Sequence, residues 1–299
     1  MDSEGLIDPQ RLRELASGML HQWHSQENLE VKRVRLSQPH QIYAIHSMAA
    51  HVHHLAPAVL RLDEEIDHIV ATPLVRLAYE SALTAQWLML RPDAANAFMN
   101  EDVRKRRATV ANLSRSASHV LNQGSVAGHD LDALETSASG VARNFDQLCA
   151  ELHHGYLDAY VYYRLLSWHA HPSVALVDDY LEPRGDDEWP VMLRVPNFGP
   201  SPYVLYFLVC SMVWAGRAVD VFDADRRRRR ELRSVARELG IPDVFNLSAE
   251  AQQKVYAFER EQRHSRRVGP RKRSSDKTGT AEDGAPAPPA GGAPAEPAP

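Results

Sequence analysis

The segment YRLLSWHAHPS, residues 162–172, combines one arginine with two histidines at short spacing. Arg164 is separated from His169 by four residues and from His171 by six, and Ser167 lies between them. RNA can be cleaved without a metal ion when its 2′-hydroxyl attacks the neighbouring phosphate. That reaction needs a proton-transfer group that works near neutral pH, which histidine provides, and a cation beside the phosphate, which arginine provides. Arg164, Ser167, His169 and His171 are therefore candidate catalytic residues.

The same residues are also compatible with an ordinary helix end. Arginine and histidine in the last turn of a helix interact favourably with its dipole. On a continuous helix, Arg164, Ser167 and His171 would share one face, whereas His169 would point elsewhere. Pro172 disfavours helical geometry at the residue before it, so an irregular last turn would redirect either histidine. The sequence leaves open which of the two histidines works with Arg164.

A second charged pair lies in the apolar segment 72–91, where Arg76 precedes Glu80 by four residues. This spacing brings the two side chains together on one helical face. We interpret them as an ion pair, whose disruption would cost about 3–5 kcal/mol if the pair were fully buried. The alternative is that Arg76 contacts a phosphate while Glu80 orients it or a histidine, which makes both supporting site residues.

The remaining histidines and cysteines do not predict a metal centre. Two histidines four residues apart on a helix would share an ion, but the cluster His46, His51, His53 and His54 lacks this spacing. His46 and His53 would lie about 10 Å apart along a helix, so the pair His153–His154 would have to complete any site. Cys149 and Cys210 lie in no chelating motif and are expected to be buried thiols. We predict no metal ion and no cofactor.

The composition predicts a cytoplasmic protein without membrane association. The first ten residues are acidic and lack an apolar core, unlike a signal peptide. The longest apolar run, residues 203–216, is shorter than the roughly 20 residues that span a bilayer. The formal net charge of −5 offers no overall attraction to nucleic acid. RNA would have to bind the local basic runs at 103–107 and 225–232. The alternative interpretation is that these runs are solvated helix faces.

Nearly every long segment has helical periodicity, which predicts an all-α fold, an antiparallel helical bundle. Asp8 is the expected N-cap of the first helix, with Pro9 at its first position. Thr72 and Pro73 are expected to begin the central helix in the same way, and Pro57 to kink or shorten the helix before it. The expected helices cover about 9–26, 39–61, 72–91, 92–123, 130–152 with a break near Gly140, 156–170, 202–222, 225–239 and 247–262.

We expect one all-helical domain over residues 1–263. The proline-rich segment 172–201 is predicted to be a long loop, with a short hairpin at 189–195, and long loops in compact domains are often functional. Residues 264–299 begin with basic residues and end in a proline- and alanine-rich stretch. Such a composition cannot bury enough apolar surface to offset its ordering entropy, so we predict a disordered tail.

Two stretches resemble a known bacterial family. RLAYESALTAQW, residues 76–87, and YRLLSWHAHPS match motifs of the domain-of-unknown-function 5677 family. This resemblance spans about residues 40–225 and implies no assigned function. The Arg-x4-6-His spacing is also similar to that of the wider HEPN superfamily. Members of that superfamily are helical bundles, and many are dimeric ribonucleases of toxin, defence or RNA-processing systems, with a composite site formed by two protomers.

This second resemblance implies a HEPN-like, metal-independent ribonuclease that binds RNA and forms a homodimer. Leu165 stands where many active members carry a polar residue, and Arg76 and Glu80 reverse their usual acidic-then-basic order. The alternative is a non-enzymatic helical protein that binds a partner or a ligand. The orientation of Arg164 and His171 relative to Arg76 distinguishes the two interpretations.

Overall fold

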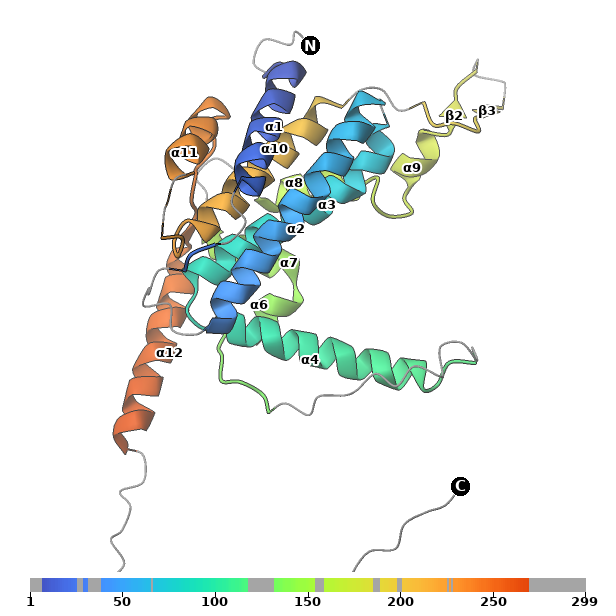
Figure 1. Ribbon diagram of the computed structural model, residues 1–299. Helices are drawn as coiled ribbons and strands as arrows, with labels where there is room; N and C mark the ends of the chain where they lie inside the picture. The colour runs from blue at the N-terminus through green and yellow to red at the C-terminus, as the bar shows by residue number, and fades with distance from the viewer. Residues whose placement is uncertain are drawn as a thin grey trace, which may run out of the picture. The chain divides into compact units, whose positions relative to one another are not determined.

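The computed structural model describes residues 7–25, 29–31, 39–65, 67–117, 132–153, 159–184, 189–197, 201–224, 226 and 228–268. Helices dominate these residues (Figure 1), which confirms the predicted all-α class. The chain divides into two compact units, Met1–Arg260 and Glu261–Pro299, and the fold and site below belong to the first. Most of the predicted tail, residues 269–299, lies outside the described residues.

Helices and two small strand pairs make up the described fold. The helices are α1 (Pro9–His24), α2 (Pro39–Glu64), α3 (His68–Leu90), α4 (Ala94–Leu113), α6 (Ser139–Arg143), α7 (Phe145–Glu151), α8 (Ala159–Ser167), α9 (Val174–Asp178), α10 (Pro202–Val219), α11 (Arg229–Glu238) and α12 (Ala249–Val268). The antiparallel strand pairs are β1 (Leu152–His153) with β4 (Asn246–Leu247) and β2 (Leu181–Glu182) with β3 (Val191–Met192). Among the described helices, none combines the length and apolar character that crossing a membrane requires.

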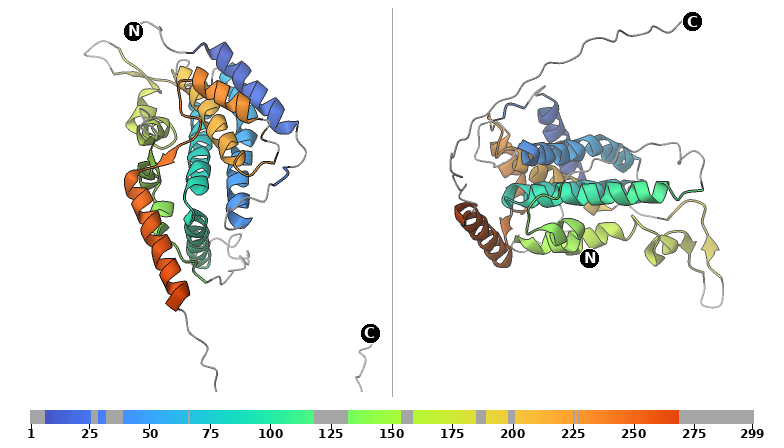
Figure 2. Two further views of the ribbon diagram at one scale, coloured as in Figure 1. Left: turned by 90° about the vertical axis from the view of Figure 1, so that its left-hand side faces the viewer. Right: turned by 90° about the horizontal axis from the view of Figure 1, so that it is seen from below.

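The core forms where α3 packs between α2 and α10. An apolar stripe of α2 is buried there, with Ile45, Ala49, Val52, Ala56 and Val59 all at 0% exposure. Small residues on α3 let its neighbours approach closely, because alanine adds little bulk between helix axes. At one end of this core, α1 and α11 lie side by side (Figures 1 and 2), joined by a 2.6 Å contact between Arg11 and Glu238.

The first predicted N-cap is confirmed, and the second is wrong. Asp8 accepts a hydrogen bond from the Gln10 amide at the start of α1. The central helix begins at His68 rather than at Thr72, and Asp67 caps it by accepting from the Val70 amide. Thr72 instead donates to the carbonyl of His68 inside the helix. Helical periodicity thus extends one turn upstream of the proline that was expected to start it.

Two prolines lie inside helices. Pro57 neither ends nor shortens α2, which continues to Glu64, and Pro73 lies in the second turn of α3. An internal proline removes one helical hydrogen bond and costs roughly 3 kcal/mol. Burial of the apolar face on both sides of Pro57 outweighs this local cost.

The predicted helix over 130–152 is two short helices, and its break lies at Asn144 rather than Gly140. Residues 132–138 are not helical, because side chains of α4 bind their backbone. Asn100 hydrogen-bonds both the amide and the carbonyl of Leu134, and Asn96 donates to the carbonyl of Glu135. These long-range contacts replace the hydrogen bonds that a helix would have made.

Other helix boundaries also differ from the prediction. The described part of α4 ends at Leu113, and residues 118–131 lie outside the description. The last helix continues to Val268, since no glycine or proline interrupts it before residue 269.

The predicted loop 172–201 contains ordered elements. It forms α9 and the β2–β3 hairpin, which we call the arm, residues 174–197, although residues 185–188 within it are not described. The Leu193 amide donates to the carbonyl of Tyr180 (2.8 Å) and the Asn197 amide donates to that of Asp179 (2.7 Å). The expected hairpin at 189–195 is only half correct, because its second strand is there but its partner strand is Leu181–Glu182.

A fully buried arginine joins the end of α3 to three other segments. Arg91 is 0% exposed and contacts Asp93 at 2.9 Å, Glu151 at hydrogen-bond distance and the Ser137 hydroxyl at 2.8 Å. Trp87 donates its indole N–H to the other oxygen of Glu151 (2.8 Å). Burial opposes ionisation of Asp93, but the hydrogen bond from Arg91 and its positive charge hold the pKa of Asp93 below its ordinary value. We call this set the Arg91 network.

Arg91→Met should destabilise the protein strongly. The substitution leaves two buried carboxylates without a cation, which typically costs about 3–5 kcal/mol. Urea unfolding followed by circular dichroism measures the loss. Arg104→Met is the matched control, because Arg104 is a solvent-exposed arginine in an ion pair with Glu101. A midpoint for Arg91→Met close to that of the control would show that the network is not needed for stability.

A buried histidine links α1 to α2. The imidazole of His53 stacks on Trp23 with 4.0 Å between ring centroids, and one of its nitrogens hydrogen-bonds the carbonyl of Ala49 (2.8 Å). The guanidinium of Arg228 lies over the other ring of the stack, 4.8 Å from the Trp23 centroid. Burial lowers the pKa of His53 from 6.5 to about 3.

The stability of the fold should therefore fall on acidification. His53 is neutral in the folded protein, but the unfolded chain binds a proton below about pH 6.5. The stabilisation is complete above that pH and declines towards pH 3, with a slope of about 1.4 kcal/mol per pH unit. Unfolding free energies between pH 7.5 and 5 should depend less steeply on pH in His53→Leu than in the wild type. His54→Gln, an exposed neighbour, should keep the wild-type slope, and an equal slope in His53→Leu would contradict this assignment.

Candidate functional site

Arg76 is the centre of a polar cluster on the side of α3 that faces α8. Its guanidinium lies 2.7 Å from His171 Nε2, 2.7 Å from the Tyr163 hydroxyl and 2.8 Å from Glu80 Oε1. The guanidinium carbon also lies 4.9 Å from the centroid of the Tyr163 ring. We call Arg76, Glu80, Tyr163 and His171 the Arg76 cluster. The predicted Arg76–Glu80 ion pair is present in it.

The cluster is held in place by the packing of α8 on α3. The Tyr79 hydroxyl, buried in the core, donates to the carbonyl of Ala159 and fixes the start of α8 (3.0 Å). Tyr163 packs against Phe145 of α7, with ring centroids 4.7 Å apart. The side chains of Arg76 and Glu80 remain 17% and 29% exposed, so a small polar ligand can reach the cluster from solvent.

His171 reaches α3 because α8 ends early. The helix stops at Ser167, and the Ala170 amide then donates to the Ser167 carbonyl in a tighter turn (3.2 Å). Ser173 donates to the carbonyl of Trp168 and caps α9 through the Leu176 amide. The predicted helix through residue 170 is therefore wrong, and so is the helical face shared by Arg164 and His171. The irregular turn before Pro172 is what carries the imidazole to Arg76.

The contact with Arg76 gives His171 Nε2 the role of a hydrogen-bond acceptor. Arginine has only hydrogen-bond donors, so Nε2 must accept from it. The Nε of the Arg76 guanidinium is buried and has no hydrogen-bond partner in the described part of the chain. The cluster thus holds an imidazole whose Nε2 accepts from a guanidinium, and an arginine that has one carboxylate partner.

The other predicted catalytic residues lie outside this cluster. The side chain of Arg164 is exposed on α8 and makes no hydrogen bond or ion pair with the residues described. The Ser167 hydroxyl donates to the carbonyl of Tyr163 (2.7 Å), which occupies it in the helix. His169 Nε2 lies 3.3 Å from Asp179 Oδ2, which connects it to the arm. The structure brings His171 and Glu80 into contact with Arg76. Arg164, Ser167 and His169 are not part of this set of contacts.

Tyr163 is not among the site residues predicted from the sequence, because a tyrosine hydroxyl does not transfer protons near neutral pH as histidine does. A helical pattern would have found it, since Ala159, Tyr163 and Leu166 follow the 4,3 spacing of a face that packs against another helix. Ala159 and Leu166 are buried, as that spacing predicts. Tyr163 therefore lies on the α3-facing side of α8, one residue before Arg164.

The described residues contain no group of three or more His, Cys, Asp or Glu side chains arranged to hold a metal ion. His46 and His53 instead both stack on Trp23, with centroid distances of 5.9 Å and 4.0 Å. His154, the other candidate donor, lies outside the described residues. Cys149 and Cys210 are buried free thiols, as expected.

The partial exposure of the Arg76–Glu80 pair reduces the cost of breaking it. Glu80→Ala leaves Arg76 with two other partners and some contact with water, so we expect a loss of about 1 kcal/mol rather than 3–5. Glu80→Gln keeps an acceptor and should lose less. Urea unfolding of both variants measures the difference. A loss of 3 kcal/mol or more in Glu80→Ala would show that the pair behaves as a buried ion pair.

Comparison with known proteins identifies a family but no characterised relative. Neither the curated proteins nor the solved structures contain a match to this sequence. Residues 42–188 match the model of a family described as "Family of unknown function (DUF5677)". The matched segment includes α3, α8 and α9, and thus all four residues of the Arg76 cluster. The segment 42–188 of this chain belongs to the DUF5677 family.

Proposed function

We propose that this protein is a metal-independent ribonuclease, with the Arg76 cluster as its active site. The observation that carries the proposal is the 2.7 Å contact between His171 Nε2 and Arg76 on a partly exposed face of α3. A neutral imidazole and a guanidinium are the two groups that attack by a 2′-hydroxyl requires. The spacing between Arg164 and His171, similar to that of HEPN ribonucleases, supports the same function.

The proposed reaction begins when a phosphate of single-stranded RNA approaches Arg76. The Arg76 guanidinium breaks its hydrogen bond to the His171 imidazole and donates to a phosphate oxygen instead. A charged acceptor makes the stronger hydrogen bond. His171 Nε2 is then free to take the proton of the 2′-hydroxyl. The O2′–P bond forms and the P–O5′ bond breaks, which leaves a 2′,3′-cyclic phosphate.

The leaving 5′-oxygen needs a proton. His169, which lies beside Asp179, is the proposed donor, and Arg164 is the proposed second cation for the phosphate. In this scheme Arg76 and His171 act on the attacking side, and Glu80 and Tyr163 position Arg76 for the exchange.

The test is cleavage of single-stranded RNA in the presence of EDTA. The purified wild type should release 5′-hydroxyl and cyclic-phosphate ends. Loss of a proton-transfer residue typically costs about 10²–10⁴-fold in rate, so His171→Ala should lower the rate by that range. Arg76→Ala and Arg164→Ala should also reduce it.

Exposed residues of α2 provide matched controls for these variants. His54→Ala and Arg61→Ala, prepared in parallel, should cleave at the wild-type rate. Activity that is absent in the wild type, or equal in His171→Ala and His54→Ala, would exclude the ribonuclease. It would favour the non-enzymatic alternative.

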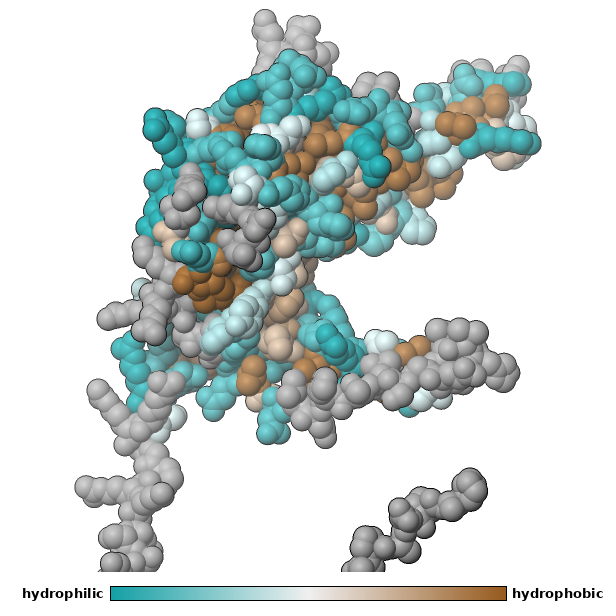
Figure 3. Space-filling view, viewed as in Figure 1, coloured by the Kyte–Doolittle hydropathy of each residue, from teal (hydrophilic) through white to brown (hydrophobic). Residues whose placement is uncertain are grey.

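A second candidate function, binding to another protein, is favoured by the apolar surface of the arm. Several large apolar side chains are exposed on the arm, on α8 and in the turn between them. They are Leu165, Trp168, Val174, Val177, Trp189, Met192 and Val195. Trp189 is 91% exposed and Met192 is 84% exposed. Figure 3 shows brown patches along this segment of the surface. We propose a second copy of the chain as the partner, which gives the homodimer expected from the resemblance.

Sedimentation equilibrium of the full chain tests this interface. The wild type should form a dimer, and the double variant Trp189→Ser and Met192→Ser should weaken the association. Tyr43→Ser is the matched control, since Tyr43 is an exposed aromatic residue on α2. A monomeric wild type, or a dimer that the double variant leaves unchanged, would contradict an interface formed by the arm.

A further inference from the structure

A pocket beside α11 has no role in the fold or in the proposed reaction. Its volume is about 630 Å³. The residues that line it are Arg226, Arg229, Arg230, Arg233, Ala236, Arg237, Ile241, Pro242 and Asp243. Five of these nine are arginines, and three of them belong to the basic run 225–232, which the sequence predicts to be a solvated helix face or an RNA-contacting patch. Helix α11, which carries four of these arginines, lies on the side of the bundle opposite to α9 (Figures 1 and 2).

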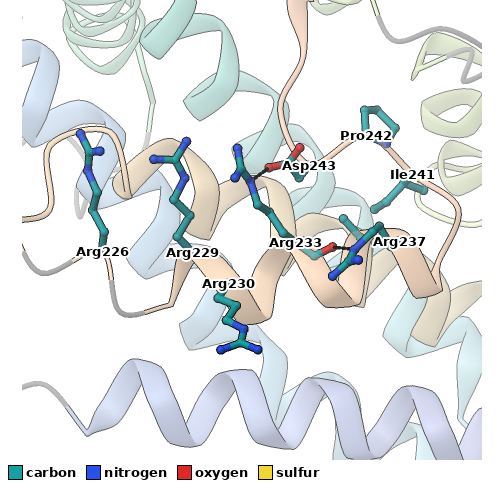
Figure 4. A pocket seen from close by; sticks show the side chains of 9 residues that line it. Arg226, Arg229, Arg230, Arg233, Arg237, Ile241, Pro242 and Asp243 are labelled. Carbon is teal, nitrogen blue, oxygen red and sulfur yellow. Dashed lines mark hydrogen bonds and ion pairs between the residues drawn. The ribbon is translucent and has the colours of Figure 1, made fainter.

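Helical spacing gathers these arginines. Arg229, Arg233 and Arg237 follow one another at intervals of four residues, which places them along one face of α11. Figure 4 shows the guanidinium groups of Arg226, Arg229 and Arg233 on the same side of the helix as Asp243, whereas Arg230 leaves on the other side. Three guanidinium groups on one side of a short helix form a site for several oxygen atoms of one ligand.

The positive charge of the pocket is only partly compensated by the described residues. Asp243 is the one acid that lines it, and its carboxylate already accepts from Arg217 (2.8 Å) and Arg233 (3.0 Å). Arg237 donates to the backbone carbonyl of Arg233 rather than to a carboxylate. The side chains of Arg226, Arg229 and Arg230 make no hydrogen bond or ion pair with described residues, so their guanidinium donors are available to a ligand.

Arg229 carries the clearest sign of unrelieved repulsion. Its Nε is buried and has no hydrogen-bond partner among the described residues. The positive charge of Arg233, followed by burial and the charges of Arg217 and Arg226, lowers the pKa of Arg229 below its ordinary value. An anion between these guanidinium groups would satisfy the buried donor and remove the repulsion.

We propose that this pocket binds a small molecule that carries two or more phosphate groups. Arginine suits phosphate because its planar fork donates two parallel hydrogen bonds to one oxyanion. The volume lies within the range of about 300–1,000 Å³ that is typical of small-molecule sites. Ala236, Ile241 and Pro242 form an apolar wall for an uncharged part of the ligand, such as a nucleoside. A nucleoside polyphosphate combines both features.

Isothermal titration calorimetry of the full chain with adenosine triphosphate and with pyrophosphate tests the site. Binding should be saturable, and sodium sulfate at equal ionic strength should not abolish it. The double variant Arg229→Gln and Arg233→Gln should raise Kd about tenfold or more, because each lost charged hydrogen bond contributes substantially to affinity. Tighter binding of adenosine triphosphate than of pyrophosphate would assign the apolar wall to the nucleoside.

A charge-matched control separates this pocket from general attraction. Arg61→Gln with Arg115→Gln removes the same net charge from exposed positions on α2 and beyond α4 and should leave Kd unchanged. Equal weakening in both double variants, or titrations that do not saturate, would overturn the proposal. Binding of single-stranded RNA without binding of either small molecule would overturn it as well and assign the arginines to nucleic acid. The ribonuclease assay is independent, because these variants leave the Arg76 cluster intact.

Discussion

The buried charge of Arg91 is the constraint on which much of this structure depends. A guanidinium with no access to water must find its counter-charge and its hydrogen bonds inside the protein. Arg91 finds them in Asp93, Glu151 and Ser137, and these residues belong to three different segments of the chain. The network therefore fixes the end of α3 relative to α7 and to the non-helical stretch before α6. Because α3 is a rigid helix, the same anchor sets the position of Arg76 about four turns upstream.

Three arginines of this chain show three degrees of charge compensation. Arg91 has two carboxylates and no exposure, and its role is structural. Arg76 has one carboxylate, a histidine and partial exposure, which leaves it able to exchange a partner. The Arg229 side chain has no hydrogen-bond partner among the described residues, and the repulsion of Arg233 acts on its charge more strongly than the attraction of Asp220. The less an arginine is compensated by its own chain, the more an external anion would gain by binding to it, and both proposed phosphate sites follow from this order.

The candidate site could be predicted only in part. Residue type and spacing made Arg76, Glu80 and His171 candidate site residues, and in the structure both Glu80 and His171 contact Arg76. The geometry that unites them did not follow, because it depends on α8 ending at Ser167 and on the turn that Ser173 stabilises. Arg164 and His171 were expected on one helical face, yet the chain leaves the helix between them. Tyr163 joins α8 to Arg76 through its hydroxyl. Residue type did not indicate this role, because tyrosine does not titrate near neutral pH.

The sequence by itself determined the helical class, the buried stripe of α2, the cap at Asp8 and the i, i+4 pairing of Arg76 with Glu80. All of these depend on interactions within a few turns of one helix, where spacing alone decides which side chains meet. The tertiary structure decided what depends on contacts between distant segments. Burial of the face around Pro57 overrode a local helix breaker, and Asn100 of α4 held residues 132–138 out of a helix. Packing of α11 beside residues 241–243 turned a basic run into a pocket, because a concave surface needs walls from more than one segment.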